Sequence, residues 1–575
     1  MNIRNIFVLV TALLTSVSCT GFLENFRPQG SVDGDEVRNP EYADNLVIAA
    51  YAVFISAEDI NSSFSLWNYD VRSDDAYKGG NGTEDGDVFH ALEISTGIMT
   101  TSWNISDIWQ RLYNSISRVN LALSVLDTLD EQEYPLRDQR IAEMRFLRGH
   151  AHFLLKQLFK KIVFCVDENL SEEGYNELDN NTYSNDEGWQ LIADDFLFAY
   201  NNLPVVQEDK GRPSKAAAAA YLAKTYLYKA YRQDNPESNA VSSINADDLE
   251  NVVKYTEETI MAAGGFALEE DFSNNFRPEP QYENGVESVW AMQYSMNDGT
   301  NKGNCNWSFG LIVPNIPGVT DGGCDFYKPS QNLVNAFRTG ADGLPLLDTF
   351  NDSDYDKSKD SVDPRLFLTV GMPGFPYEFN DNYMIAQTPT WSRSNGLYGY
   401  NVSLKHNVDP DGPYLVKGTW WGSPMNHIVL RYADVLLFRA EALAQLGRTD
   451  EAINIVNSIR NRASKSLSRL AGYEQLYGVS FNVRPYSYGI IKEETLKLVK
   501  FERRLEMAME SDRFFDLVRW GEAESVLNNY YANENDNCAI YAGASFTSDK
   551  NEYLPIPFAQ ISASGDRYGQ NIGWK

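Results

Sequence analysis

The sequence of 575 residues predicts a mainly α-helical protein: a scaffold of tetratricopeptide-like helix pairs, a loop-rich and aromatic-rich region, and a few short strands. Three observations predict this class. Apolar residues recur every three or four positions through residues 41–231 and again after residue 427, which is the spacing of one buried helix face. Between residues 264 and 424, Gly, Pro, Asn, Asp and aromatic residues replace that pattern and indicate irregular loops. A composition of 43% apolar and 22% charged residues is that of an ordinary globular protein.

The N-terminal half contains the most regular helix patterns. Residues 109–129 carry apolar side chains at steps of three and four, at Leu112, Ile116, Val119, Leu123 and Leu126. Residues 137–159, 188–203, 214–231 and 247–263 show similar spacing, so each of these segments is expected to form a helix.

A second set of helices is expected after the loops. The loop-rich region contains a strand-like run at residues 288–294, and helices are expected to resume at His427. One apolar stripe there consists of Val429, Ala433, Leu436, Ala440 and Leu443. Gly447 suits a helix C-terminus, and Thr449 suits the start of the next helix. Small residues on facing stripes are typical of tetratricopeptide-like pairs, although no 34-residue consensus is evident.

The charge balance excludes one class of partner. The chain has 49 basic and 80 acidic residues, a net charge of −31 and a pI near 4.6. Such a chain repels a phosphate backbone instead of releasing its counterions, so nucleic acid is not expected to bind. The same charge disfavours direct adhesion to an anionic membrane, but it permits a lipid tether.

The N-terminus predicts such a tether. Arg4 precedes an apolar run at residues 6–17 that is too short to span a bilayer, so residues 1–18 are interpreted as a signal peptide. The following Cys19 resembles the lipid-modified cysteine of a bacterial lipobox, which makes a lipid anchor the only expected membrane contact. The alternative is a plain secretory signal with Cys19 next to it by chance.

Neither a metal nor a cofactor is expected. The other cysteines, Cys165, Cys305, Cys324 and Cys538, form no CxxC motif, and both disulfides and free thiols remain open. The five histidines include no HExxH motif. The acidic run at residues 352–360 has some spacing of a calcium loop, but Lys357 stands where the turn glycine belongs.

Several sequence blocks together resemble the SusD/RagB family of nutrient-binding lipoproteins. The paired-helix signature corresponds to LRYADVLL at residues 430–437, Ala440 to Ala442, and NSIRNRA at residues 457–463. Further similar blocks are residues 143–159, GRPSKA at 211–216, residues 502–506, ESDRFFDLVRWG at 510–521, LPIP at 554–557, and Gln570-Asn571. The resemblance extends from Cys19 to Lys575.

The resemblance implies a fold and a function. It divides the chain into a signal peptide at residues 1–18, an N-terminal helical region at 19–263, a loop-rich region at 264–424 that is expected to bind the ligand, and a C-terminal helical region at 425–575. A member of this family is expected on the outer face of a Gram-negative outer membrane. There it caps a SusC-like TonB-dependent transporter and delivers oligosaccharide, polysaccharide or peptide to it, without catalysis.

Charged residues within the apolar helix stripes predict an interhelical ion network, because buried charges persist only when paired. They are Arg431, Asp434, Glu441, Glu502, Arg503, Arg513, Asp516 and Arg519. These residues are expected to support the fold and not to contact a ligand.

Tryptophans in polar, loop-like surroundings are the candidate ligand residues, because an aromatic face stacks on the apolar face of a sugar ring. Trp109, Trp189, Trp290 and Trp520 lie on regular stripes or a strand-like run and are expected in the core. The candidates are Trp67, Trp103, Trp307, Trp391, Trp420 and Trp421, with Asp74 and Asn104 as polar partners. Trp67, Trp103 and Trp307 rank first because amide or carboxylate residues flank them.

Two alternatives remain open. A glycoside hydrolase would need paired carboxylates, and Asp74-Asp75 and Asp194-Asp195 are examples of such pairs. With 80 acidic residues in the chain, adjacent carboxylates are expected by chance. The other alternative is a structural transporter cap with no ligand affinity of its own.

Overall fold

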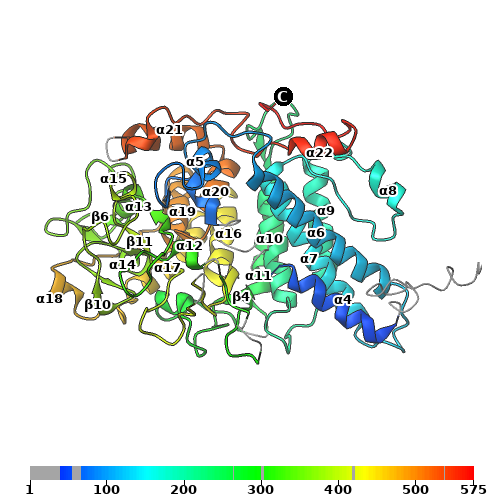
Figure 1. The fold of residues 1–575 in the computed structure, drawn as a ribbon, viewed down its shortest axis with the longest axis horizontal. Helices are drawn as coiled ribbons and strands as arrows, with labels where there is room; N and C mark the ends of the chain where they lie inside the picture. Colours follow the sequence, from blue (N-terminus) through cyan, green and yellow to red (C-terminus); the bar gives the residue numbers. More distant parts are fainter. Residues whose placement is uncertain are drawn as a thin grey trace, which may run out of the picture.

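The computed structural model shows a helical half and a loop-rich half packed side by side (Figure 1). It describes residues 39–54, 67–262, 265–299, 304–307, 309–417, 421–535 and 538–574, with the side chains of residues 41, 67–69 and 172 left out. The signal peptide at residues 1–18, Cys19, Trp420 and the side chain of Trp67 therefore lie outside the described residues.

Long helices of the N-terminal half pack against their neighbours in sequence. They are α4 (Pro40–Ala52), α6 (Trp103–Leu126), α7 (Arg137–Phe159), α9 (Asn185–Asn202), α10 (Lys215–Ala230) and α11 (Ala246–Ile260). Each segment predicted from apolar spacing forms a helix, with ends shifted by a few residues. Ser184 begins α9 with a capping box and Ser214 caps α10, so side chains satisfy the first free amides of both helices.

The C-terminal helices continue this scaffold into the other half. They are α16 (Tyr432–Gln445), α17 (Thr449–Ala463), α19 (Lys492–Met507), α20 (Arg513–Trp520) and α21 (Ala523–Glu534). Helix α16 packs against α11 on one side and against α17 and α19 on the other, so it joins the two halves. Ala452, Val456, Ile459 and Ala463 form a fully buried stripe of α17. Gly447 adopts a positive φ of 80° just after α16, as its role at a helix end requires.

The prediction that a helix resumes at His427 is wrong by five residues. Residues His427–Arg431 form strand β12, which pairs antiparallel with β4 (Ser288–Met292). The β-branched Ile428 and Val429 favour this conformation, and the pairing places Leu430 opposite Trp290. The strand-like run predicted at residues 288–294 is confirmed as β4.

The loop-rich half is built on separate two-stranded sheets in the part of the chain that the structure describes. The pairs are β1 (Ala76–Gly79) with β5 (Phe326–Pro329), β6 (Arg338–Thr339) with β7 (Ser361–Val362), β8 (Val370–Gly371) with β11 (Val402–Ser403), and β9 (Pro376–Tyr377) with β10 (Asn380–Met384). In the helical half, β2 (Tyr231–Arg232) pairs with β3 (Ser243–Ile244).

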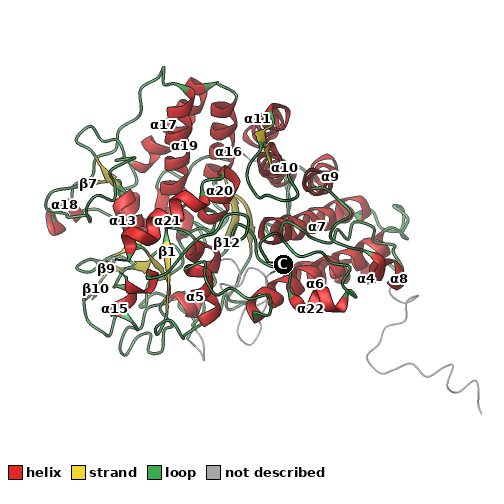
Figure 2. Cartoon of the chain, turned by 90° about the horizontal axis from the view of Figure 1, so that it is seen from above, coloured by secondary structure: helices red, strands yellow, loops and turns green. Residues whose placement is uncertain are grey.

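Short helices connect these sheets and cover the ends of the scaffold. They are α5 (Asp87–Glu93), α8 (Glu172–Glu177), α12 (Phe309–Ile312), α13 (Gln331–Ala336), α14 (Arg365–Thr369), α15 (Asn395–Tyr398), α18 (Tyr473–Tyr477) and α22 (Phe558–Ala563), with 3-10 turns η1 (Trp67–Arg72), η2 (Phe272–Phe276) and η3 (Ala539–Tyr541). Seen from above in Figure 2, β1, α13 and α21 lie together on the loop-rich side, away from α4, α6 and α7.

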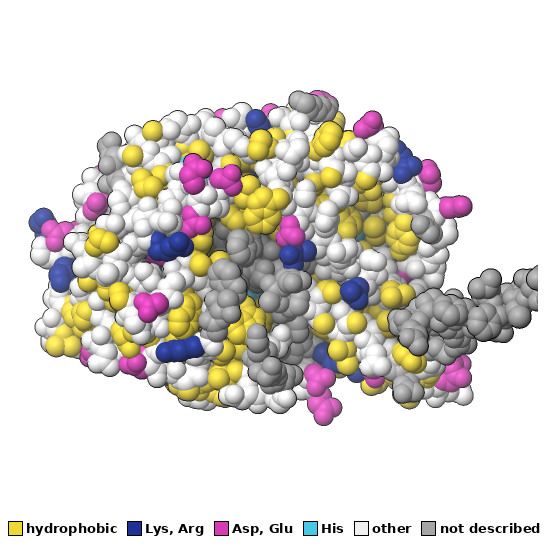
Figure 3. All heavy atoms as spheres, in the orientation of Figure 1, with side chains coloured by type: hydrophobic (Ala, Val, Ile, Leu, Met, Phe, Trp, Pro, Cys, Tyr) yellow, Lys and Arg dark blue, Asp and Glu magenta, His cyan; other side chains and the backbone are white. Residues whose placement is uncertain are grey.

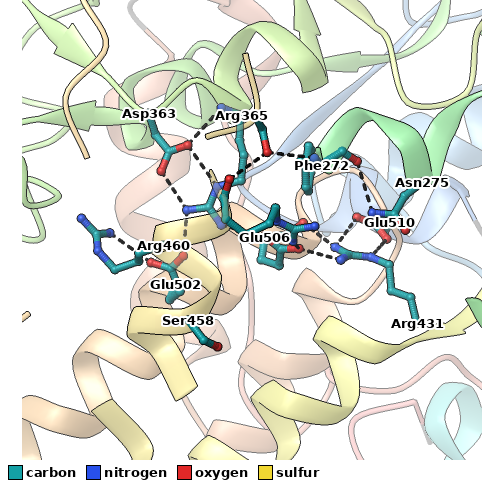
Figure 4. Close-up of polar contacts among 12 residues, drawn as sticks. Phe272, Asn275, Asp363, Arg365, Arg431, Ser458, Arg460, Glu502, Glu506 and Glu510 are labelled. Atoms are coloured by element: carbon teal, nitrogen blue, oxygen red, sulfur yellow. Dashed lines mark hydrogen bonds and ion pairs between the residues drawn. The ribbon is translucent and has the colours of Figure 1, made fainter. Parts of the chain in front are cut away.

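A buried network of arginines and carboxylates joins the two halves (Figure 4). Arg431 donates to Glu287 at 2.7 Å and to Glu506 at 2.6 Å. Arg365, from the loop-rich half, donates to Glu506 and Glu502, each at 2.7 Å. All five side chains are buried, and the paired charges compensate one another where water cannot.

The other predicted members of the network are also paired. Arg503 donates to Asp434 and to Asp516, and Arg519 donates to Asp516 at 2.8 Å and to Glu441. These contacts join α16, α19 and α20, so the charged positions of the stripes hold helices together. The predicted interhelical ion network is confirmed.

The tryptophans expected in the core are there. Trp109, Trp189, Trp290 and Trp520 are all buried in the main apolar cluster of the described residues. Trp290 also donates from its indole nitrogen to the Gly211 carbonyl at 3.1 Å, so its one polar group is satisfied.

Candidate ligand-binding site

Trp103 is the most exposed tryptophan of the predicted set whose side chain is described. It is the first residue of α6, its side chain is 55% exposed, and its ring meets the buried ring of Phe89 edge-on at 5.9 Å between centroids. Phe89 therefore supports the indole, and the exposed part of the Trp103 side chain remains available for stacking. The neighbouring Asn104 has a buried Oδ1 atom with no hydrogen-bond partner among the described residues.

Trp307 and Trp421 lie close together on two strands of chain joined by a bridge. Asn306 and Ser423 exchange backbone hydrogen bonds of 2.8 and 3.2 Å. A side chain at Gly422 would lie 3.0 Å from the ring of Trp307, so the indole rests directly on the glycine backbone. Both tryptophans are half-buried, and whether they contact a ligand stays a prediction.

Asp74 and Trp391 are not available to a ligand, and the structure corrects these two assignments. Asp74 is 3% exposed and accepts from Arg513 at 2.8 and 3.0 Å, with Arg504 at 3.1 Å. Burial alone would raise its pKa, but Arg504 and Arg513 lower the pKa of Asp74 to about 2. Trp391 is 7% exposed and packs against Tyr377 in a small apolar cluster.

The physical reason is the same for both residues. In both cases residues outside the sequence neighbourhood bury the side chain: Trp391 packs in a small core of the loop-rich half, and arginines of α19 and α20 pair with Asp74. A polar sequence neighbourhood therefore does not place a side chain at the surface. Asp74 and the adjacent Asp75 are both paired with arginines, which also argues against their use as a hydrolase pair.

The structure contains a cavity that the sequence did not predict, which we call the tyrosine cavity. Its volume is about 400 Å³, within the range of small-molecule sites. Tyr77 comes from β1, Gln331 begins α13 and Tyr398 ends α15, so segments far apart in the sequence meet there. Its aromatic and amide residues are Tyr77, Gln331, Tyr355, Phe375, Gln387, Tyr398, Tyr400 and Asn401, and its charged residues are Asp354 and Lys357.

Two hydroxyls in the tyrosine cavity have no partner. Tyr398 is 1% exposed, and its hydroxyl forms no hydrogen bond with any residue that the structure describes; the same holds for the Tyr355 hydroxyl. Burial raises the pKa of both tyrosines, so both hydroxyls stay protonated and can donate. By contrast, the Tyr77 hydroxyl donates to Glu534 and accepts from the backbone N–H of Gln331 at 3.0 Å.

The arrangement in the tyrosine cavity suits a neutral ligand rich in hydroxyl groups. Ring faces offer stacking surfaces, and amides and free hydroxyls offer donors and acceptors. One lysine and one aspartate line the cavity, so their formal charges cancel.

Neither metal nor disulfide chemistry is prominent in the described residues. No group of three or more His, Cys, Asp or Glu side chains among them could hold a metal ion, and Asp356 of the acidic run pairs with Lys359 at 2.6 Å. The four described cysteines are free thiols. Within the described ranges, no helix is long and apolar enough to cross a membrane.

Similar solved structures have the same fold. A SusD homolog from Bacteroides thetaiotaomicron matches with a TM-score of 0.71 at 20% identity and covers 95% of this chain and 100% of that one. Surface glycan-binding protein A from Bacteroides thetaiotaomicron, solved in complex with laminarihexaose, matches with a TM-score of 0.62 at 20% identity over 93% of this chain and 99% of that one.

Sequence comparison agrees with the structural similarity. SusD-like protein P2 from Formosa agariphila is 23% identical over 482 residues, which is 82% of this chain and 81% of that protein. A model of the SusD family matches residues 286–574, and a model described as starch-binding and associating with the outer membrane matches residues 46–227.

These findings define the protein first as a helical scaffold of the SusD-like type. The chain belongs to the SusD family. The resemblance that the sequence blocks indicated is thereby confirmed, as is the mainly α-helical fold class.

Proposed function

We propose that this protein binds a neutral oligosaccharide or polysaccharide at the cell surface and delivers it to a SusC-like TonB-dependent transporter. The observation that carries the proposal is the tyrosine cavity, where two buried hydroxyls without partners stand beside aromatic faces and amides. An unpaired buried hydroxyl is unfavourable in the free protein, and a sugar hydroxyl would satisfy it.

The exposed indole of Trp103 supports the same proposal as a separate stacking surface. The laminarihexaose complex of the glycan-binding relative and the starch-binding description of the second family model point to the same ligand class. Stacking alone does not select one glycan, because any sugar with an apolar face can stack on an aromatic ring. The choice of glycan depends on the other contacts of the site.

The location at the outer membrane follows from the proposed anchor. Cys19 would carry a lipid, and the family description names an association with the outer membrane. If the anchor is correct, Cys19→Ala should release the protein from the membrane without changing its fold. Membrane fractionation of cells lacking the transporter tests this, and a variant that stays with the outer membrane would contradict it.

A glycan array followed by calorimetric titration tests the binding function. Binding without product formation supports the proposal, release of shorter glycans supports a hydrolase, and silence across the array supports a structural cap. Trp103→Ala should weaken binding by roughly five- to 150-fold, the range of about 1 to 3 kcal/mol for losing one important aromatic contact.

The matched control for Trp103→Ala is Phe558→Ala. Phe558 is another exposed aromatic, 58% exposed, and it lies on α22, outside the tyrosine cavity. Its removal should leave the affinity unchanged. Equal binding by wild type and Trp103→Ala would remove Trp103 from the site and make Trp307 and Trp421 the next residues to test.

A further inference from the structure

A second cavity, in the helical half, has the opposite character to the tyrosine cavity. Its volume is about 450 Å³, and it lies between the end of α7, the loop that leads into α9, the loop after β2 and the C-terminal segment. Lys156, Lys160 and Lys161 line it, with Asp234 as the one acidic lining residue. We call it the lysine cavity.

Two of these ammonium groups donate only to neutral oxygens, and each also lies over an aromatic ring, Trp189 for Lys156 and Tyr553 for Lys160. Lys156 donates to Asn185 Oδ1 at 2.9 Å and to the Lys160 carbonyl at 3.3 Å. Lys160 donates to Asn239 Oδ1 at 2.7 Å and to the Ser238 carbonyl at 3.2 Å. Neither forms an ion pair with a carboxylate of the described residues.

Burial lowers the pKa of Lys160 to about 8, although Glu552 and Asp549 lie near enough to favour its charged form. Lys156 has no such acidic neighbour among the described residues, although the chain has a net charge of −31. On the face drawn in Figure 3, basic side chains are scattered singly among acidic, polar and apolar ones. Lys156 is buried, and burial together with the Lys160 ammonium lowers the pKa of Lys156 to about 7. A charged group in this position is destabilising until an anion compensates it.

The backbone at Lys160 gives a second observation. Lys160 ends α7 with a φ of 54° and a ψ of −62°, a conformation that side-chain-bearing residues rarely adopt and that glycine adopts freely. The chain keeps a lysine there, and Lys160 is one of the residues that line the cavity. Strained residues of this kind cluster at ligand sites.

We propose that the lysine cavity binds the carboxylate of an acidic sugar, a hexuronate unit of a glycan. The lysines supply the charge-assisted hydrogen bonds that a carboxylate accepts. The half-exposed ring of Tyr183 and the surrounding amides supply the stacking and polar contacts that a sugar ring needs. The sugar part of this assignment rests on the proposed glycan-binding function, whereas the anionic part rests on the lysines alone.

Calorimetric titration of the whole protein with glucuronate, glucose and inorganic sulfate tests the proposal. Glucuronate should bind, and glucose and sulfate should bind at least tenfold more weakly at this cavity. Absence of glucuronate binding overturns the proposal. Sulfate binding as tight as glucuronate also overturns it, because the cavity would then select an anion without recognising a sugar.

Variants at Lys160 locate the binding and remain folded. Lys160→Gly removes the ammonium and relieves the backbone strain, so it should melt no lower than wild type while glucuronate affinity falls at least tenfold. Lys160→Arg keeps the charge and should lose much less affinity. If Lys160→Gly binds glucuronate as wild type does, the lysine cavity is not the site.

Lys357→Gln, which removes the one lysine of the tyrosine cavity, is the matched control and should leave glucuronate binding unchanged. Titration of Lys160→Gly with the neutral glycan found on the array separates the two proposals, because this variant should bind the neutral glycan as wild type does while its affinity for glucuronate falls. If wild type binds no neutral glycan, only the proposed function is contradicted, because glucuronate binding is measured independently of neutral-glycan binding.

Discussion

The buried arginines of the network and the buried Lys156 have opposite surroundings, although other buried lysines, such as Lys328 and Lys405, are paired with carboxylates. Arg431 and Arg365 each contact several carboxylates, and each joins segments that are distant in the sequence. Lys156 is equally buried but donates only to neutral oxygens and lies over the ring of Trp189. The difference teaches that a compensated buried charge belongs to the scaffold, whereas an uncompensated one identifies a place where a ligand can supply the missing charge.

The largest effect is expected at Glu506, which accepts from three arginines. Glu506→Gln removes a charge shared by Arg365, Arg431 and Arg462, and should lower the free energy of unfolding by about 3 to 5 kcal/mol or more. Chemical denaturation measures this. The control Glu451→Gln, in an exposed pair with Arg448, should stay within about 1 kcal/mol of wild type.

Asp516→Ala should have a smaller effect of the same sign. Arg503 keeps Asp434 and Arg519 keeps Glu441 as partners, so the loss should be about 2 to 4 kcal/mol, near the lower end for breaking a buried pair. Thermal denaturation checks it. An unchanged melting temperature would mean that the redundancy of the network, and not each pair, supports the scaffold.

Lys156 should give a pH dependence that the arginines lack. Its pKa is about 7 in the folded protein and about 10.4 in the unfolded chain, so the unfolded state binds more protons between these values. Stability should therefore rise with pH, by up to about 1.4 kcal/mol per unit between pH 7 and pH 9, or ~2 to 3 kcal/mol in total.

The comparison of wild type with Lys156→Met isolates that contribution from the other titrating groups. Below pH 7 the variant should be the more stable of the two, and the gap should narrow as the pH rises. If the free energy of unfolding changes with pH in the same way for the two proteins, the charged form of Lys156 does not destabilise the fold. The proposed contrast between Lys156 and the paired arginines would then be wrong.

The smallest effect is expected at Tyr398. Because its hydroxyl has no partner among the described residues, Tyr398→Phe should leave the free energy of unfolding unchanged or raise it by about 1 kcal/mol. Affinity for a neutral glycan should fall by roughly two- to tenfold, which is about 0.5 to 1.5 kcal/mol for one hydrogen bond. A titration in which affinity is unchanged would remove this hydroxyl from the site.

Much of the scaffold could be predicted from the sequence because its signals are local. The spacing of apolar residues in α6 predicts its buried face, where Leu112, Ile116 and Val119 lie, and the predicted residues 137–159 are the observed bounds of α7. Charged residues on such stripes, for example Asp434 and Glu441, could be assigned to ion pairs because nothing else keeps them buried. The chain position of each partner did not matter for that inference.

The proposed ligand sites could not be predicted in the same way because they depend on distant segments of the chain meeting. The rings of Tyr77 and Tyr398 lie 6.4 Å apart between centroids. More than 300 residues separate the two tyrosines in the sequence, and no pattern in those residues predicts the contact. For Trp391 the prediction was wrong in the other direction. Its polar sequence neighbours indicated an exposed side chain, but the indole is buried in a small apolar core of the loop-rich half. Asp74 was misassigned because the arginines that bind it lie more than 400 positions later.

The division of the loop-rich half into two-stranded sheets and small apolar clusters has a consequence for how the family can diversify. A substitution near Trp391 or near Phe309 disturbs one cluster and leaves the neighbouring clusters and the main core intact. Different loops can then drift toward different ligands at separate times, each under its own selection. The arginine network beneath the loops permits no such freedom, so proteins that descend from this chain should change their loops, and the ligands that we propose these loops bind, before they change the fold.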